Sequence, residues 1–235
     1  MTDHLFSSRD AADRPLSAEH AEVIRARLTH EIPQTPAALS TITAQLRPDR
    51  PEQVAAIART LQRAAGDIDA FYRRLGPFHL YTHGLCEPER EAVDLVSMVE
   101  DRIRALQARA SDLDWRIDGG PVGIETDKTI LAVVLDELIC NAADFTPEGS
   151  VTTQIDRDGD ATLVRIDDTG PGVHTDDLPA VFAPYFSSDR APARVRPRTG
   201  LGLAIAAAGA HLLGGEVLIG RNPAGGCRAV LRVPA

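Results

Sequence analysis

The chain has 235 residues, of which 43% are hydrophobic and 25% are charged, as expected for a globular protein of one or two domains. Its formal net charge of −9 argues against nucleic acid or an anionic membrane surface as the main partner. Three widely spaced cysteines, Cys86, Cys140 and Cys227, have no metal-ligand spacing and predict a reducing, cytoplasmic compartment. We expect neither a signal peptide nor a membrane span, because no apolar run approaches about 18 residues.

Two amphipathic helices are predicted after residues 1–16, which we expect to be flexible. The first begins at Ser17, a favourable N-cap residue, and its apolar residues share one face. The second begins at Pro51 and ends at Gly76 and Pro77. A hairpin of two such helices cannot bury both apolar stripes by itself. We therefore expect residues 17–76 to form a four-helix bundle with a second copy of the chain, in a homodimer.

After a linker at residues 77–88, the pattern changes to alternating helices and strands through residues 89–235. Asp94 and Asp127 are placed to cap two helices. Strands are predicted at residues 113–117, 122–124, 151–155, 161–166, 216–220 and 228–233, and another helix at residues 200–213. Asp158 and Gly159 form a hairpin turn between two of these strands.

Four polar or glycine-rich stretches interrupt this domain. Glu137 and Asn141 stand four residues apart, so both face one side of a helix, where their oxygens suit a hard cation beside a nucleotide triphosphate. Such a pair is also typical of a solvated helix face. The other three stretches are Asp168-Thr-Gly170-Pro-Gly172, residues 181–186 (VFAPYF), and Gly200-Leu201-Gly202-Leu203.

In this order, the four stretches resemble the N, G1, F and G2 boxes of the sensor histidine kinases, members of the ATPase superfamily that includes gyrase, Hsp90 and MutL. The resemblance extends from Glu89 to the end of the chain and implies an α/β sandwich that binds ATP and Mg²⁺. The predicted fold class is therefore α+β, with an N-terminal helical hairpin followed by this sandwich.

The resemblance also implies roles for single residues. Asn141 would coordinate Mg²⁺, and Glu137 matches a position that is an acid in the hydrolysing relatives, where it activates water. Asp168 would accept a hydrogen bond from the adenine amino group. The backbone at Gly170, Gly172, Gly200, Leu201, Gly202 and Leu203 would approach the base and the phosphates. Asp144 departs from the pattern, because relatives often carry a basic residue there.

Upstream, Thr29, His30 and Glu31 resemble the H box of a phosphoacceptor domain. His30 lies about 160° around the predicted helix from its apolar stripe and so faces solvent. By this resemblance His30 takes the γ-phosphoryl group, and Glu31 accepts its proton or orients the ring. The prolines depart from the usual block: Pro33 and Pro36 predict a kink just after His30.

Between the F and G2 boxes, residues 187–198 form a polar run that matches the mobile ATP lid of the family. Arg190, Arg194, Arg196 and Arg198 cluster in this run. They would contact phosphates or an acidic receiver domain, or they form a solvated charged loop.

The leading hypothesis is a histidine kinase of a two-component system. It would phosphorylate itself on His30 with ATP and transfer the group to an Asp of a response regulator receiver domain, with its sensor in a separate protein. One alternative is an ATPase or protein-serine kinase, which Glu137 favours. The other is a non-catalytic phosphotransfer or docking scaffold with a degenerate nucleotide site, which Asp144 and the irregular H box favour.

Overall fold

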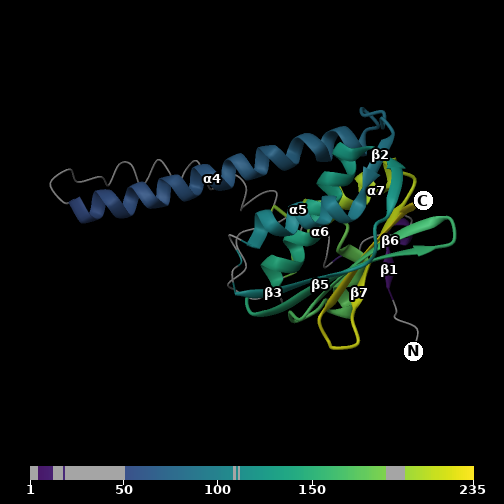
Figure 1. Ribbon diagram of the computed structural model, residues 1–235. Helices are drawn as coiled ribbons and strands as arrows, with labels where there is room; N and C mark the ends of the chain where they lie inside the picture. The colour runs from purple at the N-terminus through teal and green to yellow at the C-terminus, as the bar shows by residue number, and fades with distance from the viewer. Residues whose placement is uncertain (1–4, 13–17, 19–50, 108–109, 111, 189–198) are drawn as a thin grey trace.

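The computed structural model describes residues 5–12, 18, 51–107, 110, 112–188 and 199–235. It confirms the α+β fold class: a mixed sheet is covered by helices, and one long helix projects beyond the sheet (Figure 1). The first predicted helix of the hairpin, with His30 and Glu31, lies outside the described residues. Within the described residues, no helix has the length and apolar character needed to cross a membrane.

The main sheet has six strands in the order β1-β7-β8-β6-β5-β3. Their bounds are β1 (Phe6–Ser7), β3 (Leu113–Asp118), β5 (Gly149–Asp158), β6 (Ala161–Asp168), β7 (Glu216–Arg221) and β8 (Cys227–Pro234). All neighbours are antiparallel except β3 and β5, which are parallel. A separate antiparallel pair is formed by β2 (Glu91–Asp94) and β4 (Gly123–Thr126). The strands β3 to β8 agree with the predicted ones to within a few residues, whereas β1 and β2 were not predicted.

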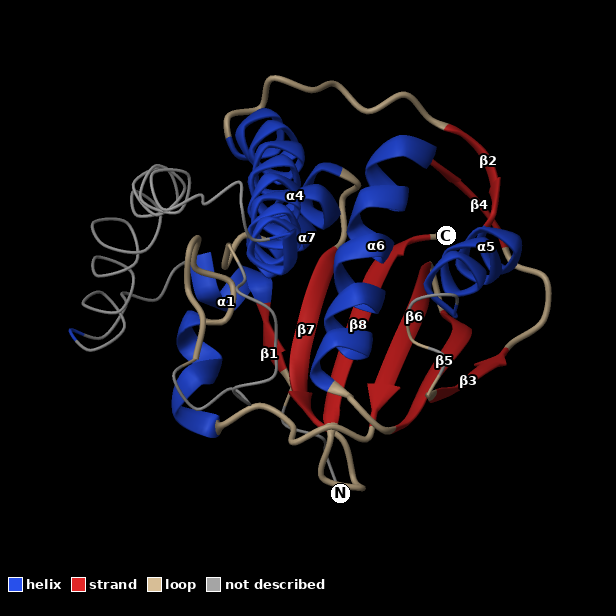
Figure 2. Ribbon diagram, turned by 90° about the vertical axis from the view of Figure 1, so that its left-hand side faces the viewer, coloured by secondary structure: helices blue, strands red, loops and turns tan. Residues whose placement is uncertain are grey.

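Three helices cover one face of the sheet: α5 (Leu95–Gln107), α6 (Lys128–Phe145) and α7 (Gly202–Leu212) (Figure 2). The core lies between the layers, where Leu135 and Leu138 of α6 and Val164 and Ile166 of β6 are at most 1% exposed. Burial of these aliphatic side chains is the main force that fixes α6 on the sheet. Asp127 caps α6 as predicted, because its Oδ1 accepts a hydrogen bond of 2.8 Å from the Ile130 amide.

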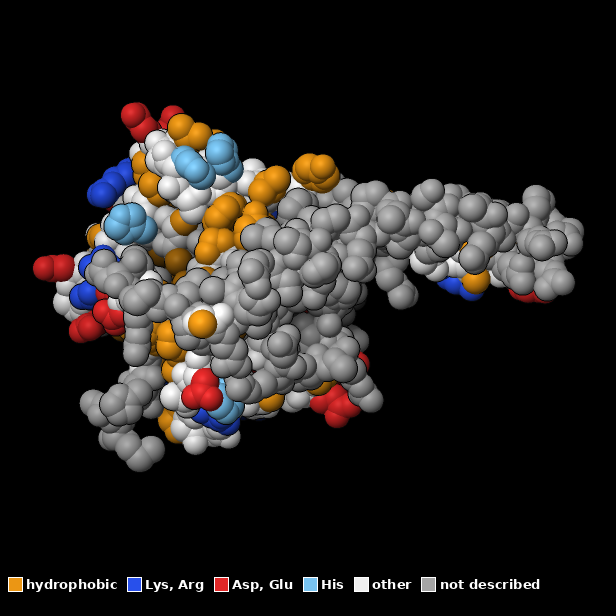
Figure 3. Space-filling model, turned by 180° about the vertical axis from the view of Figure 1, so that it is seen from behind, with side chains coloured by type: hydrophobic (Ala, Val, Ile, Leu, Met, Phe, Trp, Pro, Cys, Tyr) orange, Lys and Arg blue, Asp and Glu red, His pale blue; other side chains and the backbone are white. Residues whose placement is uncertain are grey.

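The long helix α4 (Pro51–Thr82) begins where predicted but does not end at Gly76. It continues through Pro77 to Thr82, so the first residues of the predicted linker are helical. Tyr81 is buried, and its ring lies close to Gly209 of α7, where an added Cβ would be 3.5 Å away. This packing compensates for the hydrogen bond that Pro77 cannot donate. Hydrophobic side chains gather on the surface over this end of α4 (Figure 3), where Tyr72 and Leu80 are exposed.

The N-terminal residues also differ from the expectation. Residues 1–16 were expected to be flexible, but Phe6–Ser7 form β1 on the edge of β7, and Ser8–Ala12 form the short helix α1. The Ser7 hydroxyl donates to Glu216 at 2.5 Å, and the Phe6 ring stacks on Phe182 with centroids 6.3 Å apart. The outer edge of β7 has backbone N–H and C=O groups without partners in the rest of the sheet, and the two residues of β1 form hydrogen bonds with some of them. The expectation is therefore corrected for residues 6–12.

Candidate nucleotide-binding site

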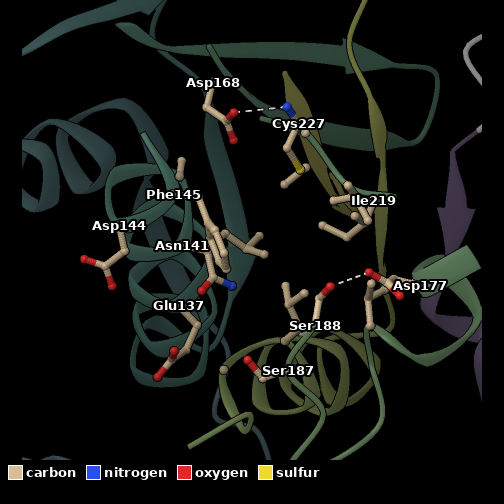
Figure 4. Close-up of a pocket in the computed structure, with 18 of the residues that line it drawn as sticks. Glu137, Asn141, Asp144, Phe145, Asp168, Asp177, Ser187, Ser188, Ile219 and Cys227 are labelled. Carbon is tan, nitrogen blue, oxygen red and sulfur yellow. Dashed lines mark hydrogen bonds between the residues drawn. The ribbon is translucent and has the colours of Figure 1, made fainter. Parts of the chain in front are cut away.

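A cavity of about 290 Å³ lies between α6, the start of α7 and the ends of the strands that carry Asp168, Ile219 and Cys227. Figure 4 shows its two sides, with α6 on one and the β7 and β8 residues on the other. The structure brings together most of the predicted site residues on its walls: Glu137, Asn141, Asp168, Gly172, Gly200, Gly202 and Leu203. Of the predicted site residues that the structure describes, two do not line it. Leu201 is fully buried in the core, and Gly170 lies behind the wall against the Phe145 carbonyl.

At one end of the cavity, Asp168 closes strand β6 and is only 4% exposed. Its Oδ1 accepts hydrogen bonds from two backbone amides, of Gly170 at 2.9 Å and of Cys227 at 3.0 Å. Within the described chain, Oδ2 has no such partner. Burial raises the pKa of Asp168, and the two amide hydrogen bonds oppose this rise. The carboxylate is thus fixed by one oxygen and can offer the other to a ligand.

Asn222 supports this end of the site, and the sequence did not indicate its role. Its side-chain NH₂ donates to the Asp168 carbonyl at 2.7 Å, and its side-chain oxygen accepts from the Gly226 amide at 3.0 Å. The residues from 222 to 226 were interpreted only as a turn between strands. An Asn at the start of a glycine-rich turn is a signal for side-chain-to-backbone hydrogen bonds, and it could have suggested this function.

Gly172 shows why the G1 turn needs glycine. Its φ is +72°, and a Cβ there would lie 2.6 Å from the Gly225 carbonyl oxygen. The turn that follows Asp168 therefore packs directly against the turn that Asn222 organises. Any other residue at position 172 would be strained by the left-handed backbone and would push the two turns apart.

The other end of the cavity contains the α6 residues and the start of α7. Glu137 is 8% exposed, and its Oε1 accepts a hydrogen bond of 2.8 Å from Nε of Arg74 on α4. Its Oε2 is buried and has no hydrogen-bond partner among the described residues. A Cβ at Gly202 would lie 2.7 Å from Oε2, so the backbone at the start of α7 approaches this carboxylate closely. Asn141 lies one helical turn further along the same wall.

These residues fit a hard cation such as Mg²⁺. A buried carboxylate oxygen without a partner is costly unless a donor or a cation meets it, and Asn141 places an amide group on the same side of α6. Within the described residues, no group of three or more His, Cys, Asp or Glu side chains could hold a metal alone. A cation here would therefore need other oxygens, such as those of phosphates.

Asp144 and the residues around the F box also lie near this end of the cavity. Asp144 is exposed and lines the edge of the cavity, and in Figure 4 its carboxylate points away from the opposite wall. Phe182 and Phe186 are buried, as predicted for the F-box anchors. The Ser188 hydroxyl donates to Asp177 at 2.5 Å at the start of the lid. The arginines at 190, 194, 196 and 198 lie outside the described residues.

A family model and known sensor proteins are similar to this chain in sequence. Residues 126–235 match the model of the family of histidine kinase-, DNA gyrase B-, and HSP90-like ATPases. The chain is 30% identical over 154 residues to the aerobic respiration control sensor protein ArcB of Escherichia coli K12, an alignment that covers 63% of the chain and 20% of ArcB. The chain thus spans about a fifth of this relative. The resemblance to sensor histidine kinases is confirmed.

Solved structures agree in fold. The Acinetobacter baumannii histidine kinase AdeS superposes with a TM-score of 0.70 at 22% identity, covering 89% of this chain and 97% of that chain. Full-length ShkA, solved in complex with AMPPNP, superposes with a TM-score of 0.66 at 23% identity, covering 92% of this chain and 46% of that chain. Both comparisons extend beyond the ATPase family region into the N-terminal part of the chain.

Proposed function

We propose that this chain is the catalytic core of a protein-histidine kinase that transfers the γ-phosphoryl group of ATP to His30. The main support is the pocket of a family ATPase domain with an anchored adenine acceptor, Asp168, at one end and the Glu137 and Asn141 oxygens at the other. The similarity to ArcB, a sensor protein, and the AMPPNP bound to ShkA support this choice of nucleotide and function.

In this proposal, Asp168 reads the adenine amino group with Oδ2, because Oδ1 is already occupied by two amides. Guanine carries a carbonyl at the same place, so a second acceptor would face the carboxylate unpaired. At the other end, Asn141 and Oε2 of Glu137 would hold Mg²⁺. When bound, Mg²⁺ offsets the negative charge of the phosphates.

The transfer itself would use His30 and Glu31. A free imidazole has a pKa of about 6.5, so it is largely neutral and nucleophilic at neutral pH. A ring nitrogen of His30 would form a bond to the γ-phosphorus while the bond to the bridging oxygen breaks and ADP leaves. Glu31 would accept the proton of the imidazole or orient the ring.

The partners follow from the same proposal. The helical hairpin would form a homodimer, and a response regulator receiver domain would take the phosphoryl group on an Asp. A separate sensor protein would supply the signal. All three cysteines are free, as a reducing, cytoplasmic setting would require.

One observation favours a second candidate, an ATPase or protein-serine kinase. The unpartnered, buried Oε2 of Glu137 is placed at the phosphate end, where a carboxylate could activate water or a hydroxyl group. Such an enzyme would release phosphate or phosphorylate another protein without labelling His30.

Incubation with γ-labelled ATP separates these functions. The kinase predicts an acid-labile label on the wild-type chain, and His30→Gln removes it while ATP affinity stays the same. His211→Gln changes an exposed histidine on α7 and serves as the matched control that keeps the label. Free labelled phosphate without labelled protein would support hydrolysis, and unchanged labelling of His30→Gln would overturn the assignment of His30.

A further inference from the structure

Arg74 brings a positive charge to the pocket from outside the ATPase domain. It lies on α4, 63 residues before Glu137 in the chain and outside the region that matches the ATPase family. Its side chain is 31% exposed and lines the cavity at the end formed by Glu137, Asn141 and Gly202. No family box includes this position, and the sequence did not single it out.

The charges around the cavity make this residue unusual. Among the described residues that line the pocket, four are acids, Glu137, Asp144, Asp168 and Asp177, and the full positive charges belong to Arg74 and Arg221. Arg221 is engaged at the adenine end, where it donates to the Gly225 carbonyl at 2.7 Å. Arg74 is therefore the one described arginine or lysine on the wall at the phosphate end.

The guanidinium of Arg74 is only partly used. Its Nε donates to Glu137 Oε1 at 2.8 Å, and within the described chain no hydrogen bond occupies the terminal nitrogens. A guanidinium has five N–H donors in a planar fork, so one edge can hold a carboxylate while the other meets a phosphate. The negative charges of Glu137 and Asp144 both act on Arg74. Without it, this end would repel a triphosphate.

We propose that Arg74 is a further nucleotide-binding residue, which contacts the terminal phosphates with the free edge of its guanidinium. It would take the place of the basic residue that relatives often carry on this helix at the position of Asp144. This inference rests on the proposed function in one respect, that the ligand is ATP. Because Arg74 belongs to α4, the phosphate end is complete only when the ATPase domain lies against that helix. Nucleotide affinity thereby depends on how the helical region docks.

The test compares nucleotides that differ only in phosphates. ATP, ADP and adenosine are titrated into the full chain as wild type and as Arg74→Gln, with Mg²⁺ and again with excess chelator. We expect the variant to lose about ten- to hundredfold in ATP affinity, less for ADP and nothing for adenosine, in both conditions, as hydrogen bonds to charged groups imply. Arg59→Gln, an exposed arginine on the same helix, gives the matched control and should bind like the wild type.

A rescue variant sharpens the test. Asp144→Lys restores a basic group on α6, so in the Arg74→Gln background it should recover most of the lost ATP affinity. Three outcomes would overturn the inference: equal losses for ATP and adenosine, a loss seen only with Mg²⁺, or ATP affinity within about twofold of the wild type. A loss of ATP affinity seen only with Mg²⁺ would show that Arg74 acts by orienting Glu137 and does not contact the phosphates. These binding results do not depend on labelling of His30, so the proposed kinase reaction can fail without deciding this point.

Discussion

The two ends of the cavity are built in different ways. At the adenine end, Asp168 is held by backbone amides from its own turn and from strand β8, and Asn222 fastens the same two segments together. At the phosphate end, Glu137 is held by a side chain from α4, and one of its oxygens has no partner among the described residues. One end is complete within the sheet, whereas the other depends on a separate helix.

The different construction of the two ends lets the site combine selectivity for the base with a dependence on α4. Backbone donors in a sheet lose little freedom on binding, so the adenine end is organised before the ligand arrives. The ion pair joins a partly exposed arginine of α4 to a buried carboxylate of α6, so it forms only when these two helices keep their relative position. We therefore infer that the base is recognised by a fixed frame, and that the phosphate end responds to the position of α4.

The largest expected effect comes from breaking the adenine end with Asp168→Asn. The amide oxygen would take the two backbone hydrogen bonds, which leaves the new NH₂ group facing the adenine amino group, donor against donor. We expect ATP affinity to fall by about a hundredfold or more, and discrimination against GTP to shrink because guanine offers a carbonyl there. Calorimetric titration of both nucleotides measures this.

The neighbouring carboxylate provides the control for this change. Asp167 faces Arg228, with which it makes two hydrogen bonds of 2.6 and 2.8 Å, and it does not line the cavity. Asp167→Asn removes the same charge, and ATP affinity should be retained. Wild-type affinity in Asp168→Asn would show that the base is not read by this carboxylate.

A smaller effect is expected at the phosphate end from Gly202→Ala. The new Cβ would lie 2.7 Å from Oε2 of Glu137, so the carboxylate must turn away from the start of α7. We expect about a tenfold loss in ATP affinity with little change for adenosine. Gly120→Ala is the control, because a Cβ there meets nothing within 4 Å. Equal losses for ATP and adenosine would contradict the division into two ends.

The smallest effect is a pH dependence confined to the adenine end. Burial raises the pKa of Asp168, so its free oxygen takes up a proton at a higher pH than an ordinary Asp and then no longer accepts from adenine. We expect ATP affinity to fall several-fold as the pH is lowered from about 8 to about 5.5. For folding the sign is opposite: the stabilisation by protonated Asp168 is present at low pH and is lost as pH rises through the raised pKa.

Titrations at several pH values, with adenosine as the ligand, isolate this effect from the ionisation of the phosphates. Asp168→Asn has no ionisable group at this position, so its weak residual binding should not vary with pH over the same range. A wild-type affinity for adenosine that is constant between these pH values would show that the carboxylate does not titrate where burial predicts.

Much of the ATPase domain could be predicted from local signals. The strands around Asp158 and Gly159, the cap at Asp127 and the helix that carries Glu137 and Asn141 each depend on residues within one or two turns. The order of the four boxes along the chain then indicated which segments line the pocket. Such patterns are local, so a sequence read along the chain is enough to find them.

The errors share one physical cause. Gly76 and Pro77 are typical of a helix end, but Tyr81 is buried near α7 and holds the helix to Thr82. The first residues have no pattern that predicts a strand, yet they pair with the exposed edge of β7. In both cases, long-range packing outweighs the local preference.

The sequence alone determined the fold class, the order of the boxes and the residue types available for a nucleotide, because periodicity, caps and turn residues act over short distances. The tertiary structure decided which groups meet. It brought Arg74 of α4 into hydrogen-bond contact with Glu137, 63 residues later in the chain. It also let Asp168 of β6 accept a hydrogen bond from the Cys227 amide of the neighbouring strand β8. No spacing along the chain encodes such contacts, because they exist only after the helices and the sheet have packed together.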